Sequence, residues 1–167
     1  ISNVRRSDTG YEVIALQNFG TIKNVHVKNI SDKCYGEHTR QGIVCGDNYG
    51  IVENCSVENA VIGTVAQEEN SIYGKVTEYG ALVGGNFGTI RGCFASDITF
   101  DGEGVTWPLA HEFPYSTIEN TYYEAEVESG DAAKTAEQFA SGEVCCLLNR
   151  GVTDGSQYWY QNIDNDA

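Results

Sequence analysis

The sequence predicts an all-β fold, a parallel β-solenoid (β-helix) of about five irregular coils that ends in a short helical cap. Three observations predict it: an internal repeat, Gly or Asn at fixed places within the repeat, and small apolar residues that alternate with polar ones. The chain has 167 residues, with 19 Gly and 2 Pro, a balance that suits tight turns. Its length fits one domain.

The repeat organises the chain. Three segments align without gaps, and each begins with Asn, an aromatic residue and Gly: 18–30, 48–60 and 86–98. Residues 117–123 and 1–4 are weaker copies. The aliphatic residue of the repeat recurs at intervals of 21, 30, 38 and 28 residues, at Ile1, Ile22, Val52, Ile90 and Ile118. Such periods are typical of solenoids, in which each coil buries its apolar face against the next.

Each copy predicts a short strand with one face toward a narrow core. The small apolar residues that alternate there are Val25 and Val27, Cys55 and Val57, Cys93 and Ala95. Just before each strand stands a residue that tolerates a left-handed backbone: Asn24, Asn54, Gly92 or Asn120. A second turn column holds Gly20, Gly50 and Gly88.

Stacked coils would place like residues over like, so the aromatic, aliphatic and Asn columns would form ladders. The alternative fold, an antiparallel sandwich, predicts strands every 8–12 residues or so but no identity between columns. The unequal intervals indicate polar insertions, at 31–41, 64–79 and 101–115, which we expect to protrude as loops and to carry any site. Residues 1–130 are thus expected to form the solenoid, and 131–167 the cap.

The pattern of the cap is helical. Thr135 and Gln138 form a capping-box pattern, and Ala136, Phe139 and Ala140 share one helical face. A second helical stretch is expected over about 141–148, with Val144, Leu147 and Leu148 buried and a stop at Gly151. We expect these helices, with Tyr158, Trp159 and Tyr160, to pack over or beside the end of the solenoid, whose open edge would otherwise invite aggregation.

Two tracts resemble the GLUG motif. They are 42–46 and 80–84, each followed by Asn-aromatic-Gly, and Gly80 and Gly84 belong to the better copy. In the first unit Glu12 and Leu16 stand where these glycines would be. Residues 139–149 are similar to a segment that often follows such repeats in large bacterial surface proteins. Together the matches cover about two thirds of the chain.

The resemblance implies a right-handed solenoid in a bacterial cell-surface or secreted protein, in particular one of a gut commensal. GLUG repeats also accompany immunoglobulin A proteases, but no HExxH zinc pattern occurs here, so no protease activity carries over. Methionine is absent and Ile1 begins in mid-repeat. We therefore expect the chain to be part of a larger polypeptide, with an extracellular location.

The charge excludes some partners. Asp and Glu number 24 against 10 Lys and Arg, a net charge of -14, and 97–167 carry 14 of the acids. This sign opposes binding to nucleic acid. No apolar run has the length of a membrane span, so no insertion is expected. The acidic half is expected to be a solvated face or a docking surface for cations or a basic partner.

No residue set predicts a cofactor, a metal or a catalytic centre. The 6 cysteines lack CxxC spacing, and Cys55 and Cys93 share a column, as core residues or as a disulfide pair. His26 is expected to point outward into solvent, while His38 and His111 lie in different insertions. Asp47 and residues 101–103 are compatible with calcium but do not predict it.

The candidate ligand-binding residues are aromatic residues of the insertions: Trp107, Tyr115, Tyr73 and Tyr79. Exposed rings stack on the apolar faces of sugars, although the same rings could instead pin the loops to the solenoid. The sequence thus favours a non-catalytic surface module, adhesin-like or a spacer, that contacts glycans or host surface proteins.

The alternative function is a carbohydrate-active enzyme of the parallel β-helix type, a polysaccharide lyase or glycoside hydrolase. It would need carboxylates to converge within about 5–9 Å in a groove. The candidates are Asp47, Glu53, Asp97 and Asp101.

Overall fold

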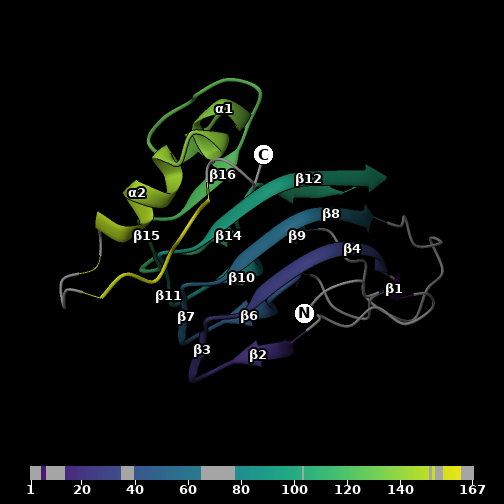
Figure 1. The fold of residues 1–167 in the computed structure, drawn as a ribbon. Helices are drawn as coiled ribbons and strands as arrows, with labels where there is room; N and C mark the ends of the chain where they lie inside the picture. The colour runs from purple at the N-terminus through teal and green to yellow at the C-terminus, as the bar shows by residue number, and fades with distance from the viewer. Residues whose placement is uncertain are drawn as a thin grey trace, which may run out of the picture.

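The chain winds through four parallel sheets that form the walls of a β-solenoid (Figure 1). The computed structural model describes residues 5–6, 14–34, 40–64, 78–102, 104–150, 152 and 156–162. The first wall contains β2 (Ala15–Asn18), β6 (Cys45–Asn48), β10 (Val83–Asn86) and β14 (His111–Glu112). The second contains β3 (Thr21–Lys23), β7 (Ile51–Glu53), β11 (Thr89–Arg91) and β15 (Thr117–Glu119).

The third wall has the longest strands, which lie side by side across Figure 1. It contains β1 (Arg5–Arg6), β4 (His26–Cys34), β8 (Ser56–Thr64), β12 (Phe94–Gly102), β16 (Tyr122–Glu124) and β17 (Ala133–Lys134). The fourth wall contains β5 (Arg40–Gly42), β9 (Glu78–Gly80) and β13 (Val105–Trp107). The predicted all-β parallel solenoid is confirmed.

The register follows the sequence repeat. Ile22 lies opposite Val52, Val52 opposite Ile90, and Ile90 opposite Ile118, so the intervals of 30, 38 and 28 residues are those of the coils. The interval of 21 residues was wrong. It would place Arg5 opposite His26, whereas β1 pairs Arg5 with Ser31. Ile1 itself lies outside the described residues.

The left-handed turns are where the sequence predicted them. The φ angles are 56° at Asn24, 51° at Asn54, 62° at Gly92 and 44° at Asn120. The second glycine column has another cause, which is close stacking. A Cβ atom on Gly50 would lie 2.1 Å from the carbonyl oxygen of Gly20, and one on Gly88 would lie 2.2 Å from that of Gly50. Only glycine lets these backbones approach so closely.

A third left-handed column interrupts the long strands. Asn29, Asn59 and Asp97 have φ angles of 57°, 50° and 52°. Without this kink, residues two apart would share a face, but Val27 and Ile30 are both buried at a spacing of three. The kink therefore acts like a bulge: it shifts the alternation by one residue and keeps the rest of the strand facing the core.

The insertions are narrower than the sequence indicated. β4 and β8 continue through Cys34 and Thr64, and the fourth wall falls within segments that were expected to be loops. In 101–115, β13 and β14 continue the solenoid. The strands of the fourth wall were missed because they are short and begin with polar or charged residues. Residues 35–39 and 65–77 lie outside the described part of the chain.

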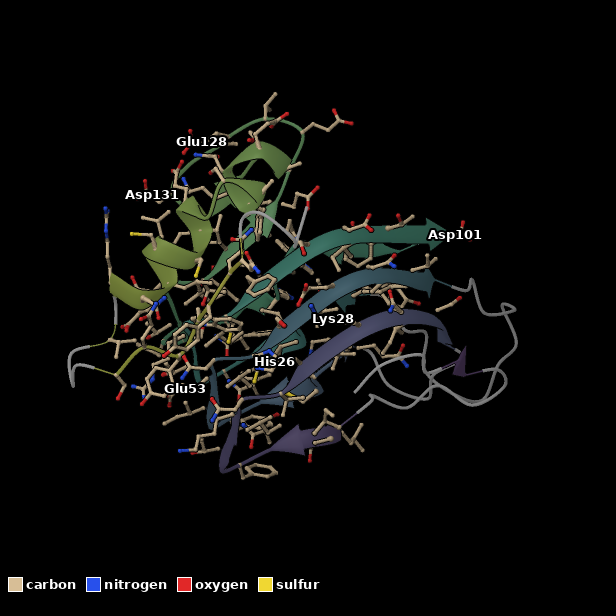
Figure 2. The ribbon with its side chains drawn as sticks, viewed as in Figure 1. His26, Lys28, Glu53, Asp101, Glu128 and Asp131 are labelled. Atoms are coloured by element: carbon tan, nitrogen blue, oxygen red, sulfur yellow. The ribbon has the colours of Figure 1, made fainter. Side chains whose placement is uncertain are left out.

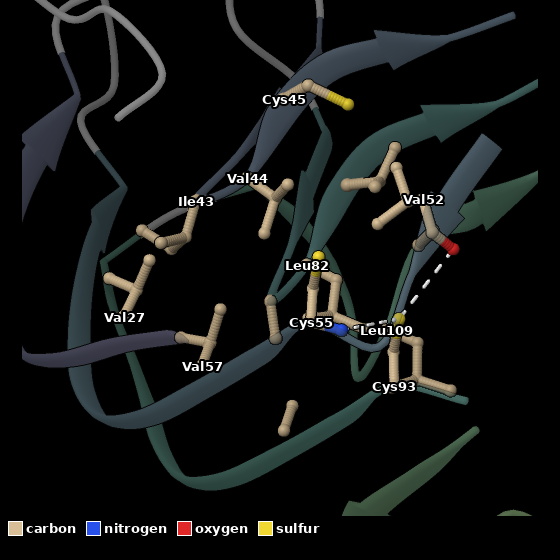
Figure 3. Close-up of a cluster of buried hydrophobic side chains, with 14 of the residues drawn as sticks. Val27, Ile43, Val44, Cys45, Val52, Cys55, Val57, Leu82, Cys93 and Leu109 are labelled. Carbon is tan, nitrogen blue, oxygen red and sulfur yellow. Dashed lines mark hydrogen bonds between the residues drawn. The ribbon is translucent and has the colours of Figure 1, made fainter. Parts of the chain in front are cut away.

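The core is a narrow column of small aliphatic residues and cysteines (Figure 3). Val27, Val52, Val57, Leu82 and Cys93 are among its fully buried members. The Cys55 backbone N–H donates to the Cys93 sulfur across 3.3 Å (Figure 3). Cys45, Cys55, Cys93, Cys145 and Cys146 are free thiols, and burial raises the pKa of Cys93 well above its ordinary value.

Gly80 and Gly84 occupy a corner without room for a side chain. A Cβ atom on Gly80 would lie 1.9 Å from the Val83 carbonyl oxygen, and one on Gly84 would lie 2.5 Å from the Gln41 nitrogen. In the last coil the position opposite Gly80 is Trp107, because within the described residues no further strand pairs with β13.

The cap contains α1 (Ala136–Ala140) and α2 (Glu143–Arg150), beside β15 and β16 in Figure 1. The predicted capping box of Thr135 and Gln138 is present. α2 begins and ends about two residues later than predicted; it buries Val144 and Leu148, while Leu147 is half-buried. Gly151 lies outside the described residues. None of the helices in the described part of the chain is long and apolar enough to cross a membrane.

Candidate functional site

A groove of about 1020 Å³ separates the outer face of the third wall from the C-terminal cap. Its floor is formed by β4, β8, β12 and β16, and its other side by α1, α2 and residues 158–161. We call it the cap groove. It lies between segments that are distant in the sequence, and no single motif marks it.

One row of outward side chains anchors the cap. His26 lies opposite Ser56, and Phe94 lies between Ser56 and Tyr122 on the neighbouring strands. The Phe94 ring packs against Phe139 of α1 at 5.8 Å and against Trp159 at 5.0 Å, measured between ring centroids. These apolar contacts hold α1 and the C-terminal segment on the sheet.

Trp159 is fixed by its backbone as well as by its ring. Its indole N–H donates to the Gly92 carbonyl oxygen across 3.1 Å. The Asn149 side chain of α2 holds the segment at both ends of this residue: it donates to the Trp159 carbonyl oxygen at 2.8 Å and accepts from the Trp159 N–H at 3.1 Å. The predicted cap therefore packs beside the third wall, against its outer face.

Two tyrosines flank this anchor and face solvent. Neighbours in an extended segment alternate in direction, so burying Trp159 turns Tyr158 and Tyr160 outward. Tyr158 is 43% exposed and Tyr160 is 75% exposed, and both line the cap groove. Gln161 fixes the segment after them, because its amide donates to the Phe139 carbonyl oxygen across 2.9 Å.

A second outward row is polar. The Lys28 ammonium group lies 2.8 Å from the Glu58 carboxylate, which also accepts a hydrogen bond from Ser56. The Asp97 backbone N–H donates to Glu124 across 3.2 Å. Within the described residues, the side chains of Ser96 and Asp97 make no hydrogen bond or ion pair. The floor thus offers hydroxyl and carboxylate groups next to exposed rings.

His26 does not project freely into solvent as the sequence predicted. Its Nδ1 lies 3.0 Å from the Ser56 hydroxyl oxygen, and its ring meets Trp159 edge-on at 5.1 Å. Burial is the largest influence and lowers the pKa of His26 below the ordinary 6.5, although Glu58 opposes this shift. Figure 2 shows His26 and Lys28 on neighbouring parts of the sheet face.

The sequence-predicted ligand residues are not brought together. Tyr79 is fully buried on β9, so the expectation of an exposed ring was wrong there: its side chain faces the core. Trp107 is half-buried and stacks on His111 at 4.7 Å, which favours the pinning role. Tyr115 is 102% exposed and has a φ of 73°. Tyr73 lies outside the described residues.

The aromatic column forms the expected ladder. Phe19, Tyr49, Phe87 and Phe113 stack with centroid separations of 5.0, 4.8 and 4.1 Å. Because stacked rings cover one another's faces, the ladder leaves few faces for a sugar and serves the stacking of the coils. Phe113 extends it into the last coil, which the sequence alone did not show.

The carboxylates named for the enzyme alternative are spread over the molecule. Asp47 of β6 pairs with Arg40 at 2.7 Å, and Glu53 of β7 pairs with Arg91 at 2.9 Å. Figure 2 shows Glu53 and Asp101 at distant places on the solenoid. In the part of the chain that the structure describes, no three His, Cys, Asp or Glu side chains gather as metal ligands would.

His111 belongs to a separate cluster. Its Nδ1 lies 2.7 Å from the Glu78 carboxylate, and its ring lies between Trp107 and Phe113. Glu112 faces Asn86 on the next strand. His38, from the other insertion, lies outside the described residues.

Comparison with known proteins gives no relative. No family model matches the chain, and no curated protein or solved structure shows significant similarity to it. The function must therefore be argued from the geometry alone.

Proposed function

We propose that this chain is a non-catalytic repeat segment of a larger bacterial cell-surface polypeptide, either adhesin-like or a spacer, that contacts glycans or host proteins. Its regular ladders support this role, because stacked identical coils make a stiff rod. The dispersed carboxylates give the enzyme alternative no support.

The observation that carries the proposal is the open first coil. Phe19 is 73% exposed, and a Cβ atom on Gly20 would meet nothing within 4 Å, whereas Gly50 and Gly88 are covered by the coil before them. The Asn18 side-chain oxygen accepts one hydrogen bond, from Gly20, whereas the Asn48 oxygen accepts from both Asn18 and Gly50. This coil has the features of one that is prepared to receive another.

The register of β1 indicates where the covering coil would come from. Arg5 already occupies the place below Ser31 in the third wall, as the end of a preceding coil would. Since Asn18 lies 13 residues before Ser31 and Arg5 lies four residues after Ile1, the equivalent Asn would stand nine residues before Ile1. In the first three coils this spacing within the coil is the same.

Two measurements test the proposal. Sequencing the coding region upstream of Ile1 should reveal an Asn-aromatic-Gly triplet at that place. Protease treatment of intact cells of the source organism should release peptides of this chain into the medium. A reading frame without such a coil, or peptides released only after lysis, would contradict it. A glycan array and a mucin pull-down then separate an adhesin from a spacer, since a spacer is silent in both.

A further inference from the structure

We propose that the cap groove is a binding site for a neutral, hydroxyl-rich oligosaccharide. The inference rests on the proposed role as a surface module and names its ligand class and its site. It depends on three features of the groove: exposed rings, uncommitted hydrogen-bonding groups and the sign of its charge.

The rings provide the apolar part of the site. Tyr158 and Tyr160 flank the buried Trp159 and line the groove with exposed surface. The backbone that carries them is held by Asn149 and Gln161, so their position is fixed before a ligand arrives. Pre-ordered aromatic side chains lose little conformational entropy on binding, and sugars present C–H faces that pack on such rings.

The polar groups match hydroxyl groups in type. A sugar hydroxyl both donates and accepts, so it needs acceptors and donors side by side. The Asp97 carboxylate supplies acceptors, and the neighbouring Ser96 hydroxyl supplies either; neither side chain has a partner within the described residues. The Tyr160 hydroxyl adds a third group without a partner there.

The charge selects against acidic ligands. Glu58, Asp97 and Glu124 line the groove with Lys28 as the one lysine, and Lys28 is paired with Glu58. The whole chain carries a net charge of -14. A uronic, sialylated or sulfated oligosaccharide would be repelled by this field, whereas a neutral one would not. A basic peptide would use the carboxylates but leave the rings and hydroxyl donors unused, so the sugar fits more of the groove.

The test is a titration of the whole chain, followed by isothermal calorimetry and by NMR of the backbone amides. The probes are cellohexaose, xylohexaose and mannohexaose as neutral sugars, oligogalacturonate as an anionic sugar, and hexalysine as a cationic peptide. Tyr160→Ala removes a ring, and Asp97→Asn removes a charge while keeping a residue that tolerates a positive φ. Tyr115→Ala is the matched control, because Tyr115 is exposed but does not line the groove.

We expect at least one neutral sugar to bind and to shift amides of β12 and of residues 158–161. Tyr160→Ala should weaken binding about tenfold and Asp97→Asn about fivefold, with Tyr115→Ala unchanged and all melting temperatures retained. The inference is overturned if no neutral sugar binds, if neither groove variant weakens binding, if Tyr115→Ala weakens it, or if hexalysine or oligogalacturonate displaces the sugar. In these cases the proposed function stands if intact cells still release the chain on protease treatment, so the two failures are distinguishable.

Discussion

Asn48 donates its side-chain amide to the side-chain oxygen of Asn86 across 2.8 Å, and both side chains are fully buried. Asn18 makes the same bond to Asn48, also at 2.8 Å. Each oxygen in addition accepts the backbone N–H of the glycine two residues later. A buried amide ladder therefore runs through the corner between the first and second walls and fixes the register of the coils.

Replacing the middle member of this ladder should be costly. Asn48→Ala leaves the buried Asn18 and Asn86 side chains without a partner, and it removes the acceptor of the Gly50 N–H. We expect the free energy of unfolding to fall by about 2–4 kcal/mol. Asn18→Ala, at the open end, should cost only about 1 kcal/mol. Urea denaturation followed by circular dichroism measures both, and equal losses would contradict the ladder.

The glycine column predicts a sharper contrast. Gly50→Ala forces a Cβ atom against the Gly20 carbonyl oxygen, which is backbone and cannot swing aside. The loss should exceed about 3 kcal/mol. Gly20→Ala is the matched control: its Cβ meets nothing, so the change should stay within about 0.5 kcal/mol. If thermal melts show the same shift for both variants, Gly50 is not closely stacked.

The third left-handed column predicts a stabilising change. The Asn59 amide donates to the Asn29 oxygen across 2.7 Å, but the ladder stops at Asp97, which has no amide to donate. Asp97→Asn should extend it and raise the free energy of unfolding by about 0.5–1 kcal/mol. Asp97→Ala should lower it, because alanine tolerates the positive φ poorly. A destabilised Asn variant would refute the shared column.

The cap should respond to pH through His26. Its pKa is lowered by burial, so the unfolded chain binds a proton at a higher pH than the folded chain. The contribution of His26 is complete above a pH of about 6.5 and declines as the pH falls through the folded-state pKa. Glu58, which favours the charged form, and Lys28, which opposes it, are the charged neighbours in the same groove.

Trp159 reports this change. In a Trp107→Phe background it is the only tryptophan, and its emission should shift to the red between about pH 7 and pH 5 as its contact with His26 loosens. His26→Gln should abolish the shift. Emission that does not change with pH, or that changes equally in both proteins, would separate Trp159 from His26.

The sequence predicted the parts of the fold in which like residues recur. Asn24, Asn54, Gly92 and Asn120 could be recognised as one turn column because Asn and Gly exchange there. The kink at Asn29 was missed, since a left-handed residue inside a strand breaks the alternation on which the strand assignment depends. Tyr79 was misread because aromatic residues mark both cores and exposed loops.

The cap groove could not be predicted in the same way. Its anchor joins Trp159 to Gly92, 67 residues apart, through one hydrogen bond. Neither residue belongs to a shared pattern, and their contact depends on how the cap settles on the third wall. The sequence did indicate that the aromatic group 158–160 would pack against the solenoid, but not which of its rings would face solvent.

The account depends on coils that stack directly on one another, and the ring protons of Tyr49 test this most directly. In a nuclear Overhauser spectrum of the selectively labelled chain, Tyr49 should show cross-peaks to Phe19 on one side and Phe87 on the other, as centroid separations of 5.0 and 4.8 Å require. A Tyr49 ring with cross-peaks to neither phenylalanine would contradict the solenoid.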